Sequence, residues 1–161
     1  MRTCFATLTL LVAVIVFVGG TARASHYALA DVPRLMKPGQ VEKLQKASVT
    51  TTSELLDKAA TGKDRKALAK TSGLGAADLL ALARRCDLLR LKGVGSEMVL
   101  LLEAAGIKTT ADLAKQQPAG LMTAITAANK TAKITEKPPT EPQLADWIDQ
   151  AKKLPQVLES K

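Results

Sequence analysis

Two glycine bends are the parts of this sequence whose residues could do chemistry. Gly73 and Gly75 form the first bend, Gly93 and Gly95 form the second, and each bend precedes a segment with helical periodicity. A glycine bend that leads into a helix exposes successive backbone N–H groups at the positive end of the helix dipole, where they can bind a phosphate oxygen. The sequence therefore predicts phosphate binding at both bends, with Ser96 contributing at the second.

Basic side chains before the second bend could attract an anion from a distance. They are Arg84, Arg85, Arg90 and Lys92. Backbone phosphate contacts of this kind hold duplex DNA without reading its sequence, and the affinity falls steeply with salt. The same side chains could instead form the solvated face of a helix. Glu97 favours that second interpretation, because a carboxylate two residues after Gly95 repels phosphate.

Few residues offer catalytic chemistry. His26 is the single histidine, so neither a Ser-His-Asp nor a Cys-His arrangement is expected, and no His/Cys cluster has metal-ligand spacing. Asp78, Asp112 and Asp146 fall in the first turns of expected helices, where capping and the helix dipole account for them. Trp147 lies on an apolar helical face and therefore predicts no base-stacking surface. We expect no enzymatic activity, no metal, no cofactor and no small-molecule substrate.

The first 24 residues have the pattern of a secretory signal peptide. Arg2 precedes an apolar run over residues 5–18, and small residues at positions 22 and 24 predict cleavage before Ser25. We therefore expect an exported protein, either periplasmic or secreted. The alternative is an uncleaved inner-membrane anchor over residues 4–22, which is barely long enough to span a bilayer. Membrane contact is expected only through this segment.

The composition is that of a basic globular chain. The 161 residues carry 23 basic and 15 acidic side chains, a net charge of +8. Removal of residues 1–24 takes away two arginines and no acid, which leaves 21 basic side chains against 15 acidic ones. This excess favours anionic partners, although lysines also keep helix surfaces soluble. Cys86 would be the one remaining cysteine, so no disulfide is expected within the processed chain.

The sequence after residue 25 predicts an all-α domain. Good helix formers dominate, and no run alternates apolar and polar residues as a half-buried strand does. Thr51 and Glu54 have the spacing of a capping box, which marks a helix start. We expect Gly62 to end that helix in a left-handed conformation. The pattern also predicts a turn over residues 87–91 and a polar loop over residues 130–139.

An internal repeat relates the two halves of the chain. A shift of 58 residues pairs Leu44 with Leu102, together with several neighbouring residues on each side. Ten further residues in the polar loop then pair Leu79 with Trp147. The repeat predicts a compact bundle of short helices built from two duplicated halves. We expect one shared core, because neither half alone could bury its apolar face well.

Three runs of the sequence resemble a known family. The runs 87–97, 101–110 and 146–154 are similar to an uncharacterised bacterial family of tandem helix-hairpin-helix domains, a domain of unknown function. The resemblance covers Val32 to Leu154, and it implies the tandem helix-hairpin-helix fold without any catalytic residue. DNA binding is implied only by analogy with the wider helix-hairpin-helix group. A weaker resemblance links the chain to small, basic, exported competence proteins that capture DNA.

Together these patterns divide the chain into four parts. They are a signal peptide over residues 1–24, a flexible N-terminus over 25–31, a tandem helix-hairpin-helix domain over 32–154 and a C-terminal tail over 155–161. One hypothesis is a non-enzymatic binding or scaffolding module whose partner is a protein or a second copy of the chain. The other is sequence-independent binding of duplex DNA at the two glycine bends. Glu97 and the exported setting favour the first hypothesis.

Overall fold

The computed structural model describes residues 27–159, which form eight α-helices, one short 3₁₀ helix (η1) and no strand. The elements are η1 (Leu29–Asp31), α1 (Pro38–Lys46), α2 (Thr52–Lys58), α3 (Gly62–Ser72), α4 (Ala76–Leu88), α5 (Ser96–Ala104), α6 (Thr110–Leu113), α7 (Pro118–Ala132) and α8 (Glu141–Lys153). The predicted all-α class is confirmed. The expected signal peptide, its anchor alternative and His26 lie outside the described residues.

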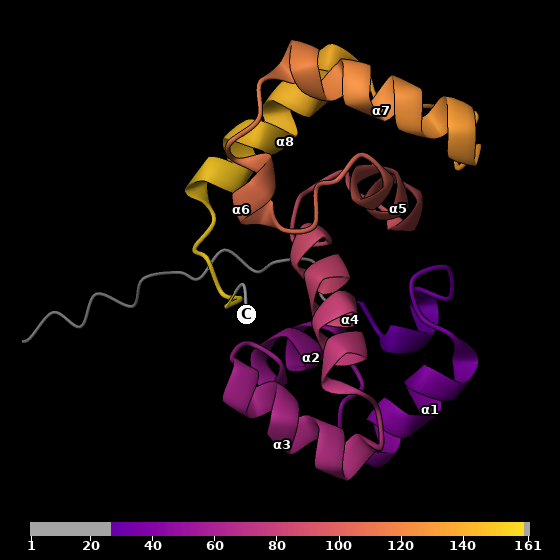
Figure 1. Ribbon diagram of the computed structural model, residues 1–161, viewed down its shortest axis with the longest axis vertical. Helices are drawn as coiled ribbons and strands as arrows, with labels where there is room; N and C mark the ends of the chain where they lie inside the picture. The colour runs from indigo at the N-terminus through magenta and orange to yellow at the C-terminus, as the bar shows by residue number, and fades with distance from the viewer. Residues whose placement is uncertain (1–26, 160–161) are drawn as a thin grey trace, which may run out of the picture.

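Helix α4 joins two groups of helices (Figure 1). Its first part packs against α2 and α3, and its other end leads to α5. We call residues 27–75 the N-terminal lobe and residues 96–153 the C-terminal lobe. Helix α8 packs against α6 and α7 in the C-terminal lobe, as α4 packs against α2 and α3 in the N-terminal lobe.

A single hydrophobic core runs through both lobes and through α4. Leu44 of α1, Leu79 of α4 and Leu102 of α5 are fully or almost fully buried members of it. Trp147 is only 3% exposed, so its predicted place in the core is confirmed. A continuous core agrees with the expectation that neither half buries its apolar face alone.

Local capping signals position most of the helix starts. Thr51 Oγ1 accepts the N–H of Glu54 at 3.2 Å, and Glu54 accepts the N–H of Thr51 at 3.1 Å. Thr109 and Asp112 form the same reciprocal pair, with both distances at 3.1 Å. Such pairs satisfy backbone donors that a helix start otherwise leaves free. The predicted capping box at Thr51 is thus confirmed.

Three predicted helix boundaries were wrong. Helix α2 ends at Lys58, and Gly62 is the first residue of α3, because Thr61 caps the new helix by accepting the N–H of Asp64. Helix α4 extends to Leu88, two residues into the predicted 87–91 turn, and residues 89–91 form the turn. Helix α7 likewise extends to Ala132, three residues into the predicted polar loop.

The helix bounds support the predicted repeat and correct its register. Shifting α1 by 58 residues reproduces both bounds of α5, and the same shift moves the start of α2 onto the start of α6. For α4 and α8, however, the buried faces align at a shift of 65, which pairs Leu79 with Leu144 and Leu82 with Trp147. The predicted pairing of Leu79 with Trp147 was therefore wrong by three residues. A slip of nearly one helical turn preserves the apolar face, so periodicity alone does not detect it.

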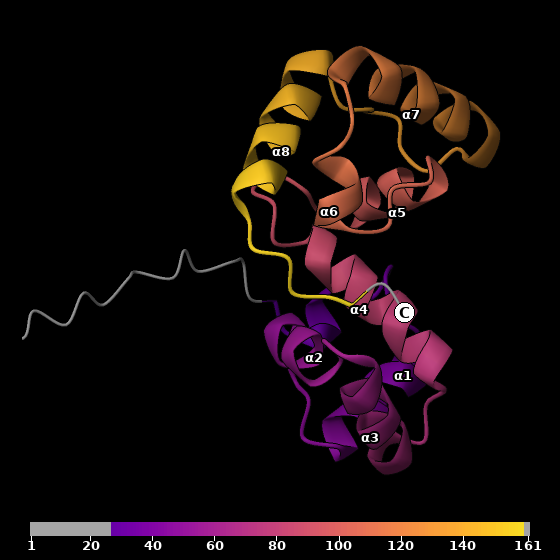
Figure 2. The same ribbon diagram turned by 60° about the vertical axis from the view of Figure 1, so that its left-hand side comes forward.

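Both ends of the described chain are held by the N-terminal lobe. Thr52 N–H donates to Tyr27 O at 2.9 Å and Leu29 is fully buried, although residues 25–31 were expected to be flexible. We call residues 154–159 the strap; it leaves α8 and crosses to the N-terminal lobe (Figure 2). Glu159 N–H donates to Ala60 O at 3.0 Å, and Leu158 is buried. The predicted tail is thus a packed element over the residues described.

Candidate functional site

The second glycine bend connects α4 to α5 and depends on glycine for its geometry. Gly93 has φ of +84°, and a Cβ atom there would lie 3.3 Å from Trp147 Nε1. Gly95 is the N-cap of α5 and offers no side chain to the first turn. The backbone donors of Ser96 and its neighbours therefore lack a side-chain cap from this position. The glycine bend thus leads directly into α5, which the sequence predicted as a helix.

The two glycine bends do not form one site. Gly73 and Gly75 precede α4, whereas Gly93 and Gly95 follow it. The 13 residues of α4 separate the bends by roughly 20 Å, since an α-helix rises about 1.5 Å per residue. A phosphate at one bend would gain nothing from the other.

Arg85 and Arg90 are engaged within the protein. Arg85 Nη1 donates to Leu35 O at 2.7 Å, and its other nitrogens donate to both carboxylate oxygens of Glu103. Arg90 Nη1 donates to Asp87 Oδ1 at 2.7 Å and to Pro155 O at 3.1 Å. Two of the four predicted phosphate-binding cations thus hold parts of the chain to each other.

Glu97 is tied to both lobes. Its Oε1 accepts from Arg34 of the N-terminal lobe, and its Oε2 accepts from Thr135 Oγ1 at 3.1 Å. Arg34 also donates to Ile134 O at 3.5 Å. The carboxylate lies in the first turn of α5, where its negative charge interacts favourably with the helix dipole and would repel a phosphate. This residue connects the lobes beside the bend.

Lys92 and Arg84 lie in different surroundings. The N–H of Lys92 donates to Gln150 Oε1 at 2.8 Å, so α8 holds the bend through its backbone, while the residue itself is exposed. Arg84 lines a small cavity of about 140 Å³ together with residues of α6 and the strap. Of the predicted cations, Lys92 is the exposed one at the second bend.

Asp87 is a structural centre that sequence reasoning missed. Its side chain is buried, and Oδ2 accepts from the N–H of Thr110 at 2.7 Å and from its Oγ1 at 2.8 Å. Oδ1 forms an ion pair with the guanidinium group of Arg90. The sequence did contain a signal for this role. Asp87 is a carboxylate in the last turn of an apolar helix, and a charge buried there requires a partner.

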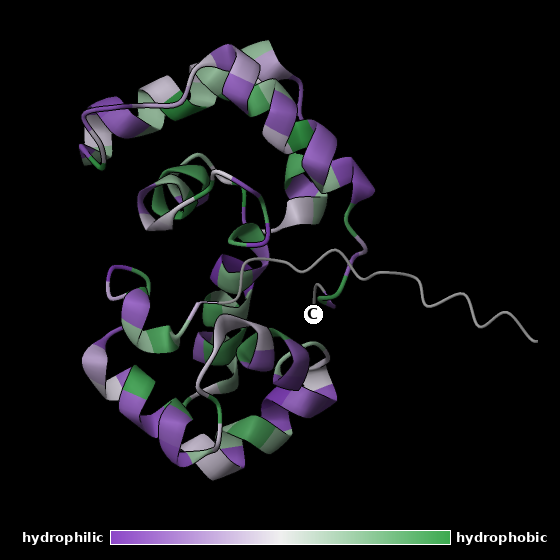
Figure 3. Cartoon of the chain, turned by 180° about the vertical axis from the view of Figure 1, so that it is seen from behind, coloured by the Kyte–Doolittle hydropathy of each residue, from purple (hydrophilic) through white to green (hydrophobic). Residues whose placement is uncertain are grey.

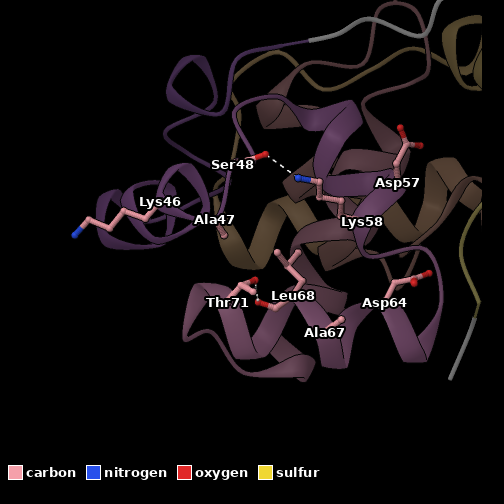
Figure 4. Close-up of a pocket in the computed structure, with 9 residues that line it drawn as sticks. All are labelled: Lys46, Ala47, Ser48, Asp57, Lys58, Asp64, Ala67, Leu68 and Thr71. Atoms are coloured by element: carbon pink, nitrogen blue, oxygen red, sulfur yellow. Dashed lines mark hydrogen bonds between the residues drawn. The ribbon is translucent and has the colours of Figure 1, made fainter.

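The larger cavities are open grooves with mixed charge. One of about 660 Å³ lies among α1, α2 and α3 in the N-terminal lobe (Figure 4). Lys58 Nζ donates to Ser48 O at 2.8 Å there, and Asp57 and Asp64 stand apart on separate helices. Another of about 720 Å³ lies beside Glu97 and the loop after α7. Neither groove brings together a nucleophile and a base.

Among residues 27–159, two side chains have clearly shifted pKa values. Backbone and side-chain hydrogen bonds from Thr50, with others from Thr51, hold the pKa of Glu54 below its ordinary value. Burial, together with the negative charge of Asp87, raises the pKa of the Cys86 thiol to about 12. Both shifts follow from helix capping and core packing.

Over residues 27–159 the fold defines an all-α domain whose bends are braced by its own side chains. No group of three or more His, Cys, Asp or Glu side chains within these residues could hold a metal ion. None of the described helices is both long enough and apolar enough to cross a membrane.

The chain belongs to the family described as Domain of unknown function (DUF4332), whose model matches residues 34–154. Comparison with curated proteins and with solved structures gave no match. The predicted membership of an uncharacterised family is therefore confirmed over nearly the expected range.

Proposed function

We propose that this protein is a non-enzymatic helical module that acts by binding a protein or a second copy of itself after export to the periplasm or the exterior. The helix-hairpin-helix interpretation and the duplication belong to the same proposal. The matched bounds of α1 and α5 and the bend between α4 and α5 support them. Family membership carries no ligand with it.

The observation that carries the proposal is that two of the predicted phosphate-binding cations, and the neighbouring Glu97, make contacts within the protein. Arg85, Arg90 and Glu97 all connect segments that are distant in sequence. A rigid pair of braced lobes suits a scaffold, which must keep its binding surfaces in fixed relation. Tyr27 is the one large hydrophobic side chain exposed on the described surface, so a partner would meet polar surface and bind with a salt-sensitive affinity.

Duplex DNA binding is the second candidate. The first turn of α5 receives no side-chain cap from Gly95, and the neighbouring Lys92 is exposed, which favours an anion at this bend. Glu97 stands against it. Such binding would be independent of DNA sequence and would weaken steeply with salt.

Sedimentation equilibrium of residues 25–161 over a concentration series tests self-association. In parallel, site-specific photo-cross-linking from exposed positions in whole cells tests for a protein partner. We expect either a reversible dimer or one discrete cross-linked protein. A monomer at every concentration with no cross-linked protein contradicts the proposal.

The DNA candidate needs its own titration with duplex DNA at low and high salt. Gly95→Asp places a carboxylate in the bend and should abolish binding there, whereas Gly39→Asp in the first turn of α1 is the matched control. Binding that is steep in salt and lost only in Gly95→Asp would replace the proposed partner with DNA.

A further inference from the structure

The positive charge of the protein is unevenly distributed between the lobes. The N-terminal lobe, residues 27–75, carries nine basic and five acidic side chains, whereas the C-terminal lobe, residues 96–153, carries seven of each. The net positive charge of the described region therefore lies in the N-terminal lobe and in the bend after α4, which contains Arg90 and Lys92. Simple solubilisation by lysine predicts no such difference between the lobes.

Three lysines line the outer face of α3. Lys63, Lys66 and Lys70 are all exposed, and their spacing places them on one side of the helix. Asp64 is the one acidic residue of α3, and its carboxylate accepts from Thr61 Oγ1 at 2.6 Å at the helix start. Glu54 is likewise occupied by the N–H groups of Thr50 and Thr51.

Further lysines surround the same end of the lobe. Lys43 of α1 reaches Gly73 O at 3.4 Å, next to the end of α3, and Lys46 and Lys58 border the groove between α1, α2 and α3. Lys46 points away from that groove (Figure 4). We call the six residues Lys43, Lys46, Lys58, Lys63, Lys66 and Lys70 the basic end. Helices α1 and α3 lie at the end of the molecule opposite α7, with hydrophilic residues along them (Figure 3).

The arginines of this lobe are used differently from its lysines. Arg65 is buried and donates to Ala59 O at 2.8 Å and to Ala60 O at 3.1 Å, and Arg34 pairs with Glu97. The exposed charges are therefore ammonium groups rather than the planar guanidinium groups that bind single phosphates in a fixed geometry. Such a surface suits a diffuse anionic partner whose charges need no register.

We infer that the basic end docks the N-terminal lobe on an anionic membrane surface, with lipid phosphate headgroups as its ligand. The inference rests on the proposed export, which brings the chain to a membrane. Electrostatic attraction of this kind needs no apolar side chain inserted into the membrane. Each lysine near such a surface raises the partition of the protein onto the membrane roughly fivefold.

Flotation of residues 25–161 with lipid vesicles tests the inference. Vesicles of phosphatidylcholine mixed with phosphatidylglycerol should bind the protein at low salt, and vesicles of phosphatidylcholine alone should not. A triple variant with Lys63→Glu, Lys66→Glu and Lys70→Glu should lose at least roughly a hundredfold in partition onto the anionic vesicles. Added salt should weaken the wild-type binding, because exposed charges are screened over about 10 Å at 0.1 M ionic strength.

The matched control reverses three exposed lysines of the C-terminal lobe. Lys130→Glu, Lys137→Glu and Lys153→Glu change the net charge equally and should leave the partition within roughly threefold, since they lie outside the basic end. Circular dichroism confirms that both variants are folded.

Equal losses in the two triple variants would overturn the inference, because net charge alone would then explain the binding. Wild-type protein that does not bind anionic vesicles would also overturn the inference. So would wild-type protein that binds duplex DNA but no vesicles, if the α3 triple variant loses that DNA binding. Self-association measured by sedimentation does not depend on vesicles. Failure of membrane docking is therefore distinguishable from failure of the proposed binding function.

Discussion

At the scale of single residues, the charged side chains near the second bend act as internal connectors. Asp87 is the clearest case, because its buried carboxylate accepts the N–H of Thr110 of α6 and forms an ion pair with Arg90. Arg90 in turn donates a hydrogen bond to Pro155 O of the strap. We expect Asp87→Ala to lower the free energy of unfolding by about 3–5 kcal/mol, since it leaves a largely buried arginine without its counter-charge. Urea unfolding measures the change.

Asp149 provides the control for that prediction. It pairs with Lys152 on the exposed face of α8, at 3.2 Å. Removing one member of an exposed pair changes stability by about 1 kcal/mol or less. Similar small losses in Asp87→Ala and Asp149→Ala would contradict the central role given to Asp87.

Cys86 offers a second prediction at this scale. Burial raises the pKa of its thiol to about 12 from an ordinary value of 9.0, so the folded protein keeps a proton that the unfolded chain releases. Stability from this group is complete below pH 9.0 and is lost as the pH rises towards about 12. Between pH 8 and pH 11, roughly the range that spans this titration, wild-type protein should lose more stability than Cys86→Ala. Thermal melts compare the two slopes, and parallel slopes would contradict the buried, protonated thiol.

At the scale of secondary-structure elements, local signals in the sequence predicted more than did periodicity. The Thr51 capping box stands where short-range chemistry places it. The position of Gly62 was predicted wrongly because glycine can either end a helix or follow the N-cap of the next one. Thr61 caps α3, so Gly62 is the first residue of that helix. The register of α8 was missed because an apolar stripe looks the same after a slip of three residues.

The repeat predicts a stabilising substitution at the end of α1. Ser48 has φ of +58°, and the residue 58 positions later, Gly106, has φ of +89° at the end of α5. A non-glycine residue in the left-handed region costs about 1–2 kcal/mol, so Ser48→Gly should raise the free energy of unfolding by up to about 1 kcal/mol after the entropy loss of glycine. Thermal or urea unfolding measures this gain.

Gly106 supplies the reciprocal test. A Cβ atom there would meet no neighbour within 4 Å, so Gly106→Ser carries only the backbone penalty, partly offset by the lower entropy of the unfolded chain, and should destabilise by up to about 1 kcal/mol. Loss of stability in both variants would show that the two helix ends are not equivalent.

At the scale of the whole molecule, the two lobes are joined by more than α4. Arg85 connects α4 to Leu35 O and Glu103, Arg34 connects to Glu97, and the strap reaches Ala60. Sequence reasoning assigned Arg85 and Arg90 to a phosphate because their partners lie up to 65 residues away. In the sequence, a run of basic residues before a bend has the same pattern whether the side chains bind a phosphate ligand or donate to carbonyl oxygens of the same chain.

The strap gives the last prediction. Leu158 is buried and lines the small cavity that also contains Arg84 and residues of α6. Gly62 N–H donates to Glu159 Oε2 at 3.0 Å, which places a carboxylate at the start of α3. We expect Leu158→Ala to lower the free energy of unfolding by about 2–5 kcal/mol, the range for a buried leucine. Glu159→Gln, which keeps the size but removes the charge, should lose about 1 kcal/mol or less because the residue is exposed.

Hydrogen exchange of Leu158→Ala locates the effect. Because the core is continuous, unfolding in urea should remain a single transition, and protection should fall in both lobes together with that of Gly62. Val157→Ala, at a half-buried neighbour, is the matched control and should change stability less. Two separate transitions in the variant would mean that the lobes are independent folding units, and the strap would then be a brace between domains rather than part of one core.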